Sequence, residues 1–129
     1  MQYSDRARAI LLEAQKNQSQ LGIVDVLVAI TTVECGVGQH VLNEAGVRRP
    51  ALLDLLSNAN PSTVLAVIQR TAEREACDWG HPFVGSEHLL LACLKLLDRM
   101  PEAPLIRQAI QIDYTHAKGA ILRILGVDR

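Results

Sequence analysis

The stretch WGHPFVGSEHLLLACL, residues 79–94, decides the fold because a loop in it turns directly into an apolar helix. Gly85 permits the backbone to swing into that helix. Ser86 is placed to cap the helix through its hydroxyl, and Glu87 puts a negative charge in the first turn, where the helix dipole favours it. The stretch therefore predicts a long buried helix that begins near Gly85.

This helix start has an earlier copy in the chain. GSEHLLLACL (85–94) aligns with GIVDVLVAIT (22–31) at an offset of 63. Upstream, PSTVLAVIQRTAEREA (61–76) aligns with YSDRARAILLEAQKNQ (3–18) at an offset of 58. Because both alignments keep the helical spacing of apolar residues, we predict two copies of one four-helix unit.

The two copies fill a single domain, 1–129, with repeat one over about 3–57 and repeat two over about 61–126. Ser4 and Ser62 are the expected N-caps of the two first helices. The first helix is expected over about 5–20, with one apolar stripe made of Ala7, Ile10, Leu11 and Ala14. The remaining expected landmarks are a helix over about 24–34 that stops at Gly36, a left-handed Gly46, Pro50 opening the fourth helix, a break at PEAP (101–104) and Gly126 as terminator.

Composition narrows the class of protein. The 129 residues are 49% hydrophobic but only 3% aromatic, which is typical of a helical globular domain. With 13 basic and 14 acidic residues and no basic run longer than Arg48-Arg49, we expect neither nucleic acid nor a membrane as partner. The chain has three cysteines, Cys35, Cys77 and Cys93. Because the number is odd and no C-x-x-C pair occurs, we expect all three to be reduced thiols. The start MQYSDRARA lacks signal-peptide features, so we expect a cytoplasmic protein, or a plastid stromal one if a transit peptide has been removed.

Three motifs resemble the Clp amino-terminal repeat domain, which stands at the front of ClpA- and ClpC-type unfoldases. The opening YSDRA (3–7), the residues GH and GSEHLLL within 80–91, and the close VLNEAGV (41–47) match the family's pattern. The first copy departs from it, because the H-N-Y-I segment is lost there. The resemblance covers nearly the whole chain and implies an all-α fold of two tandem four-helix repeats with pseudo-twofold symmetry, eight helices and no sheet.

The same resemblance implies a function without catalysis. The chain has no G-x-x-x-x-G-K-[ST] phosphate loop, so it is similar to stand-alone members that lack the ATPase modules. It implies a non-enzymatic module without cofactor, an adaptor or accessory regulator that binds Clp ATPase or protease subunits, adaptors and substrate proteins. Two alternatives stay open: a structural accessory subunit of the protease without substrate contact, and a repurposed helical module that binds an unrelated ligand.

Glu87 is the first candidate site residue. In ClpC-type domains an acidic residue at this position is thought to pair with the guanidinium of a phosphorylated arginine; the alternative is a purely structural first-turn acid. The equivalent first-copy residue is Val24, which cannot make that pair, although neighbouring Asp25 is a second candidate. Phosphoarginine-bearing partners are therefore expected at a single site at most.

Three further candidates surround the turn. The family match implies that His81 and His88 make side-chain hydrogen bonds that fix it. A metal site is not expected, because His88 and Cys93 are five residues apart and ligands on one helix face are expected at i, i+4. Trp79 either packs against the start of the following helix or anchors a partner in a groove between the repeats.

Overall fold

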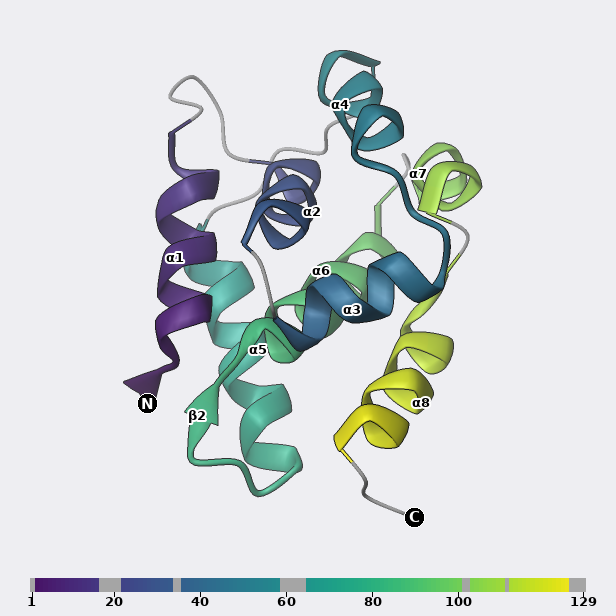
Figure 1. Ribbon diagram of the computed structural model, residues 1–129. Coiled ribbons are helices and arrows are strands. Elements are labelled where there is room, and N and C mark those ends of the chain that lie inside the picture. Colours follow the sequence, from purple (N-terminus) through teal and green to yellow (C-terminus); the bar gives the residue numbers. More distant parts are fainter. Residues whose placement is uncertain are drawn as a thin grey trace.

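A computed structural model describes residues 2–16, 22–33, 36–58, 65–100, 103–110 and 112–125. These residues form eight helices (Figure 1): α1 Asp5–Ala14, α2 Ile23–Thr32, α3 Val37–Glu44, α4 Arg49–Asn58, α5 Leu65–Asp78, α6 Ser86–Leu97, α7 Ala103–Ile110 and α8 Tyr114–Leu125. They also form two strands of two residues each, β1 Gln2–Tyr3 and β2 Phe83–Val84. The all-α class is confirmed.

The expectation of no sheet is wrong. β1 and β2 pair in parallel, with Gln2 opposite Phe83 and Tyr3 opposite Val84. The backbone N–H of Ser4 then donates to the carbonyl of Val84 at 2.9 Å. The pairing arises because both segments run extended into a helix start, where their backbone polar groups need partners. It also fixes the start of α1 beside the loop that precedes α6.

The beginning of α1 follows the sequence closely. The Ser4 hydroxyl accepts a hydrogen bond from the backbone N–H of Ala7 at 3.1 Å, and all four residues of the predicted apolar stripe are buried. The helix ends at Ala14 rather than near residue 20, with Gln15 as C-cap. Beyond Ala14 the polar sequence QKNQ offers no further side chain to bury.

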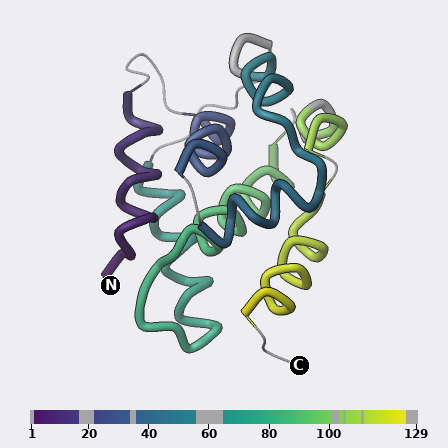
Figure 2. The backbone as a smooth tube through the Cα atoms, viewed as in Figure 1, coloured from purple at the N-terminus to yellow at the C-terminus, as the bar shows by residue number. Residues whose placement is uncertain are grey.

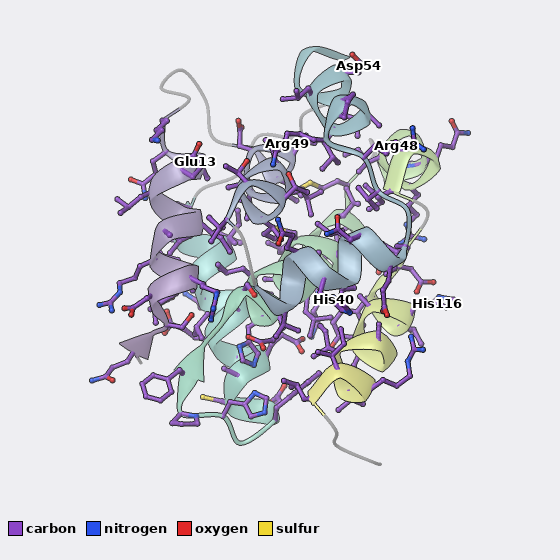
Figure 3. All side chains as sticks on the ribbon, viewed as in Figure 1. Glu13, His40, Arg48, Arg49, Asp54 and His116 are labelled. Carbon is purple, nitrogen blue, oxygen red and sulfur yellow. The ribbon has the colours of Figure 1, made fainter. Side chains whose placement is uncertain are left out.

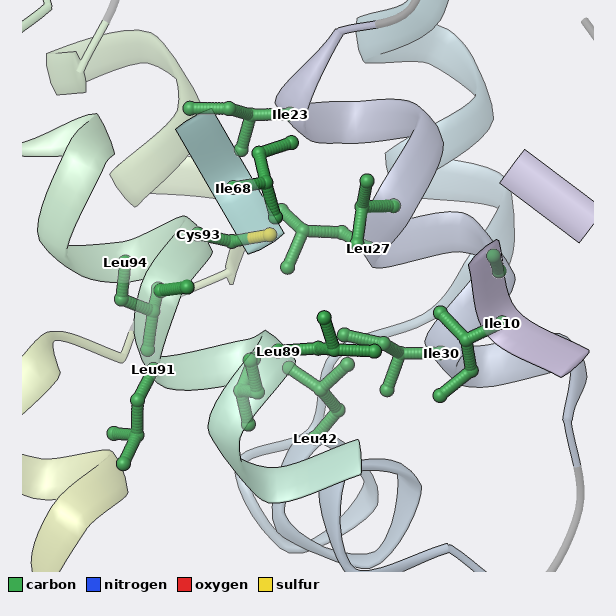
Figure 4. Packing of buried hydrophobic residues seen from close by; sticks show 14 of the residues in the cluster. Ile10, Ile23, Leu27, Ile30, Leu42, Ile68, Leu89, Leu91, Cys93 and Leu94 are labelled. Carbon is green, nitrogen blue, oxygen red and sulfur yellow. The ribbon is translucent and has the colours of Figure 1, made fainter. Parts of the chain in front are cut away.

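The core surrounds α2 and α6. Eight of the ten residues of α2 and nine of the twelve of α6 are buried, which is typical of helices that are apolar on all sides. α6 contacts α1, α2, α3, α5 and α8, and it crosses the centre of the molecule (Figures 1 and 2). Figure 4 shows the side chains of both helices meeting, with Leu27, Ile30, Leu89 and Cys93 among them.

The two cysteines that the structure describes are free thiols. Burial raises the pKa of Cys93 to about 12, so this thiol stays protonated and unreactive. Cys77 is exposed on α5. Cys35 lies outside the described residues.

The order of helix contacts repeats. α1 packs on α2 as α5 packs on α6, α2 packs on α4 as α6 packs on α8, and the crossed pairs α3 with α8 and α4 with α7 both occur. This is the tandem arrangement that the sequence predicts. The expected repeat boundary and the caps Ser62 and Gly126 lie outside the described residues, so the boundaries stay a prediction.

Several helix ends lie where the sequence predicts them. Gly46 has φ +79°, and the N–H of Val47 donates to the carbonyl of Leu42, which closes α3 as expected. A break after α6 is confirmed, since α6 ends at Leu97 and α7 begins at Ala103, but Ala103 and Pro104 of the predicted break lie within α7. Pro50 is the second residue of α4, and its neighbour Arg49 donates to the Thr31 carbonyl at 2.8 Å, which ties α4 to the end of α2 (Figure 3).

In the part of the chain that the structure describes, no single helix is long and apolar enough to cross a membrane. By length and composition alone, α2 and α3 taken together would be long and apolar enough to cross a membrane, with a bend of 97° between them. Within the fold, however, α2 is a core helix.

Candidate functional site

The loop between α5 and α6 begins with a left-handed glycine. Gly80 has φ +72°, and the N–H groups of Gly80 and His81 donate to the carbonyls of Cys77 and Ala76 at 2.9 and 2.8 Å. This pair of bonds is a Schellman motif, which satisfies the last carbonyls of α5 and reverses the chain. The loop then runs through β2 into Gly85, the N-cap of α6.

His88 and His81 form a chain of hydrogen bonds within this loop. Nδ1 of His88 accepts from the N–H of Gly85 at 2.8 Å, so the ring carries its proton on Nε2. That Nε2–H donates to Nδ1 of His81, also at 2.8 Å. The expectation that the two histidines fix the turn through side-chain hydrogen bonds is confirmed. Burial, followed by repulsion from His81, lowers the pKa of His88 to about 4, and the ring is neutral at pH 7.

Trp79 packs on the same two rings. Its ring centroid lies 5.5 Å from that of His81 and 6.1 Å from that of His88, both in edge-to-face geometry. Nζ of Lys118, on α8, lies 5.8 Å from the Trp79 ring centroid. Trp79 is half-buried against the hydrophobic core, as the packing interpretation predicts. Its role as a partner anchor stays a prediction.

Glu87 lies in the first turn of α6, as expected, but most of its side chain is covered. Only 12% of the side chain is exposed, and the carboxylate folds back over the Cα of Gly85, with Oε1 3.5 Å from Nδ1 of His88. Burial raises the pKa of Glu87, and the opposing backbone hydrogen bond at its own N–H is a smaller effect. The loss of water around the carboxylate thus outweighs the interactions that favour its ionised form.

The expectation that Ser86 caps α6 is wrong. Gly85 is the N-cap, and the Ser86 hydroxyl accepts instead from the backbone N–H of Gly38 at 3.0 Å, at the start of α3. This bond is possible because α3 and α6 approach closely there: a Cβ on Gly38 would lie 2.9 Å from the Ser86 carbonyl oxygen. Ser86 therefore joins the two repeats.

Asp25 is the first-repeat counterpart of His88. Its Oδ2 accepts from the N–H of Gly22 at 2.8 Å, the same bond that His88 makes with Gly85, and the residue is 4% exposed. Val24, the counterpart of Glu87, is fully buried. The Asp25 carboxylate thus lies in the interior and caps α2, and its role as a partner contact stays a prediction.

Glu87, His81 and His88 line one cavity of about 350 Å³, which we call the Glu87 groove. α1 contributes Arg6 to its wall, which Ser4, Val37, Pro82, Phe83 and Leu125 also line. Phe83 is 47% and Leu125 37% exposed, so the groove has apolar walls open to solvent. Arg6 makes no ion pair with any described residue.

Two of the five candidates, Asp25 and Trp79, do not line the groove. The Arg6 contribution could have been found in the sequence, since it belongs to the YSDRA opening. Phe83 and Leu125 could not, because only the β1–β2 pairing and the approach of α8 bring them to the same cavity.

A larger cavity, of about 640 Å³, also borders Phe83. Its charged residues, Asp5 and Arg8, pair with each other. The Glu87 groove is the better candidate, because its carboxylate and its cation face a cavity without being paired to each other. Among the described residues, no group of three His, Cys, Asp or Glu side chains is arranged to hold a metal ion.

Comparisons with known proteins agree on the fold. No family model matches the chain. The chain is 26% identical, over 95% of its length, to the chaperone protein ClpC3, chloroplastic, of Oryza sativa subsp. japonica, and it spans 15% of the length of that relative. Among solved structures it is similar to the Hsp104 N-terminal domain of Candida albicans, with TM-score 0.75 and 18% identity over all of this chain and 95% of that one. A chain from a malarial protein secretion system gives TM-score 0.73 and 17% identity, over 95% and 94% of the two chains. The protein thus has a Clp amino-terminal-domain-like fold.

Proposed function

We propose that this protein is a non-enzymatic binding module that brings substrates or adaptors to a Clp ATPase or its protease. The similarity to ClpC3 over nearly the whole chain supports this proposal, and so does the fold shared with the Hsp104 N-terminal domain. Because the chain spans only 15% of the length of ClpC3, the activity of that larger protein is not carried over.

The observation that carries the proposal is the mixed character of the Glu87 groove. Phe83 and Leu125 offer apolar contacts, whereas Arg6 and Glu87 offer opposite charges in the same cavity. A peptide segment needs both kinds of contact, apolar area for affinity and charges for orientation. A groove of about 350 Å³ holds a few side chains rather than a folded domain.

Phosphoarginine fits these charges. Its guanidinium would pair with the Glu87 carboxylate, and its phosphate would pair with the Arg6 guanidinium. Glu87 would first rotate away from Gly85, leaving the folded-back position in which burial raises its pKa. Pairing with a cation favours the ionised form, so binding would release a proton from any protonated Glu87 and would strengthen as pH rises through that pKa.

A native pulldown from an extract of the source organism tests the proposal. The wild-type chain is expected to recover Clp ATPase or protease subunits, identified by mass spectrometry. Phe83→Ala should reduce this recovery, because it removes an exposed apolar wall of the groove. Leu53→Ala is the matched control, since Leu53 is 46% exposed on α4 and does not line the groove.

Two outcomes contradict the proposal in different ways. Recovery of Clp subunits that Phe83→Ala leaves unchanged would favour a structural accessory subunit that does not use the groove. Failure of the wild-type chain to recover any Clp subunit would favour a repurposed module with an unrelated ligand.

A further inference from the structure

A third cavity, of about 190 Å³, lies between α5 and α6 and shares no lining residue with the Glu87 groove. We call it the basic cavity, because four of its six lining residues are cationic: Arg70, Arg74, Lys95 and Arg99, with Thr71 and Leu96 completing the wall. Neither of the last two is acidic. Every charged side chain that lines the cavity is therefore positive.

Helix geometry explains the cluster. Arg70 and Arg74 are four residues apart on α5 and therefore share a helix face. Lys95 lies in the last turn of α6, and Arg99 lies two residues beyond the end of that helix. α5 and α6 pack along each other, which brings the two pairs together. No two of these four residues are adjacent in the sequence, so no basic run marks the cluster.

The charges of the basic cavity are poorly compensated. Lys95 pairs with Glu75, whose carboxylate is buried and lies 3.2 Å from Nζ. Within the described part of the chain, Arg70, Arg74 and Arg99 have no carboxylate at ion-pair distance. Cations at i, i+4 repel each other, so the arrangement costs stability in the free protein. A bound anion would remove that cost.

The ammonium group of Lys95 is already held in position in the free protein. Besides Glu75, its Nζ lies 5.7 Å from the ring centroid of Tyr114. The Tyr114 hydroxyl donates to Glu75 at 2.8–2.9 Å, which fixes the buried carboxylate. A cation that is already positioned loses less conformational entropy when an anion binds.

We propose that the basic cavity binds the phosphoryl group of a phosphorylated serine or threonine on a partner polypeptide. Arginine guanidinium groups match the oxygens of a phosphate dianion in bidentate geometry, and three arginines line the cavity. The small volume suits one tetrahedral anion rather than a polyanion. No carboxylate lines the cavity to receive the guanidinium of phosphoarginine, which separates this site from the Glu87 groove.

Nucleic acid fits the basic cavity less well than a phosphopeptide. No aromatic ring lines the cavity to stack a base. The chain also carries a net charge of −1, so beyond this cluster it offers little attraction to a polyanionic backbone.

Fluorescence anisotropy on the full chain tests the proposal with three peptides of one sequence that carry phosphoserine, serine or glutamate at one position. The phosphoserine peptide should bind about tenfold more tightly than either of the others. Arg74→Glu should weaken its binding by about tenfold. Arg123→Glu, an equal charge change at an exposed site on α8 outside the cavity, should change it less than about twofold. Circular dichroism checks that both variants fold.

Four results would overturn the proposal. The first is that the serine peptide binds as tightly as the phosphoserine peptide. The second is that the glutamate peptide binds as tightly as the phosphoserine peptide, which would mean that charge alone is recognised. The third is an equal effect of Arg123→Glu and Arg74→Glu. A single-stranded oligonucleotide that displaces the phosphoserine peptide at lower concentration than unlabelled phosphoserine peptide would also overturn it, in favour of nucleic acid.

Discussion

At the scale of single residues, His88 holds the loop in front of α6. One ring nitrogen accepts from Gly85 and the other donates to His81, so both nitrogens are in use only while the ring is neutral. The family resemblance implied these bonds, but the sequence could not supply the tautomer or the pKa, because both depend on burial. The unfolded chain binds more protons than the folded one between pH 4 and about 6.5, so His88 stabilises the fold above this window and loses that contribution as pH falls through it.

His88→Gln is expected to flatten this pH dependence. Glutamine at the same helix position keeps an acceptor for the Gly85 N–H but cannot titrate. In urea unfolding at pH 7 and pH 4, the wild-type chain should lose about 3 kcal/mol more than the variant. His116→Gln, at an exposed residue paired with Asp113, should behave like wild type. Equal losses in wild type and His88→Gln would contradict this account of the loop.

At the scale of elements, the informative contact is the close approach of α3 and α6. The sequence predicted both helices, but it placed the Ser86 hydroxyl at the cap of its own helix. In the fold that hydroxyl bonds to Gly38 across the repeats. Sequence periodicity specifies which face of a helix is buried, whereas the distance between two helices depends on every residue between them. For this reason local spacing correctly predicts that Ser4 caps α1, whereas it gives the wrong hydrogen-bond partner for Ser86.

Gly38→Ala is expected to destabilise the protein by about 1–3 kcal/mol, because the new methyl group would meet the backbone of Ser86 and the side chain of Ile30. Gly119→Ala is the matched control. It lies inside α8 with nothing within 4 Å of its added methyl group, and it should stabilise the protein by about 0.5–1 kcal/mol. Chemical denaturation of both variants at pH 7 measures these changes. A Gly38→Ala variant as stable as wild type would mean that the helices do not approach as described.

At the scale of the whole molecule, the two repeats share a fold but differ in what they expose. In both, a polar side chain three residues after a glycine caps the central helix: Asp25 in the first repeat and His88 in the second. Beside them lie buried Val24 and the groove residue Glu87. The sequence alignment could predict this asymmetry, because it needs only the identity of aligned residues. It could not predict the groove wall or the basic cavity, since both are assembled by elements that are distant in sequence.

The measurement that tests the central claim most directly is a calorimetric titration of the protein with phosphoarginine. The account predicts one site per chain, which Glu87→Gln abolishes and Arg74→Glu leaves intact, because Glu87 lines a groove whereas its first-repeat counterpart, Val24, is fully buried. Titration in the Arg74→Glu background also removes any contribution from the basic cavity. Two equivalent sites in that background, or no binding by the wild-type chain, would contradict the account.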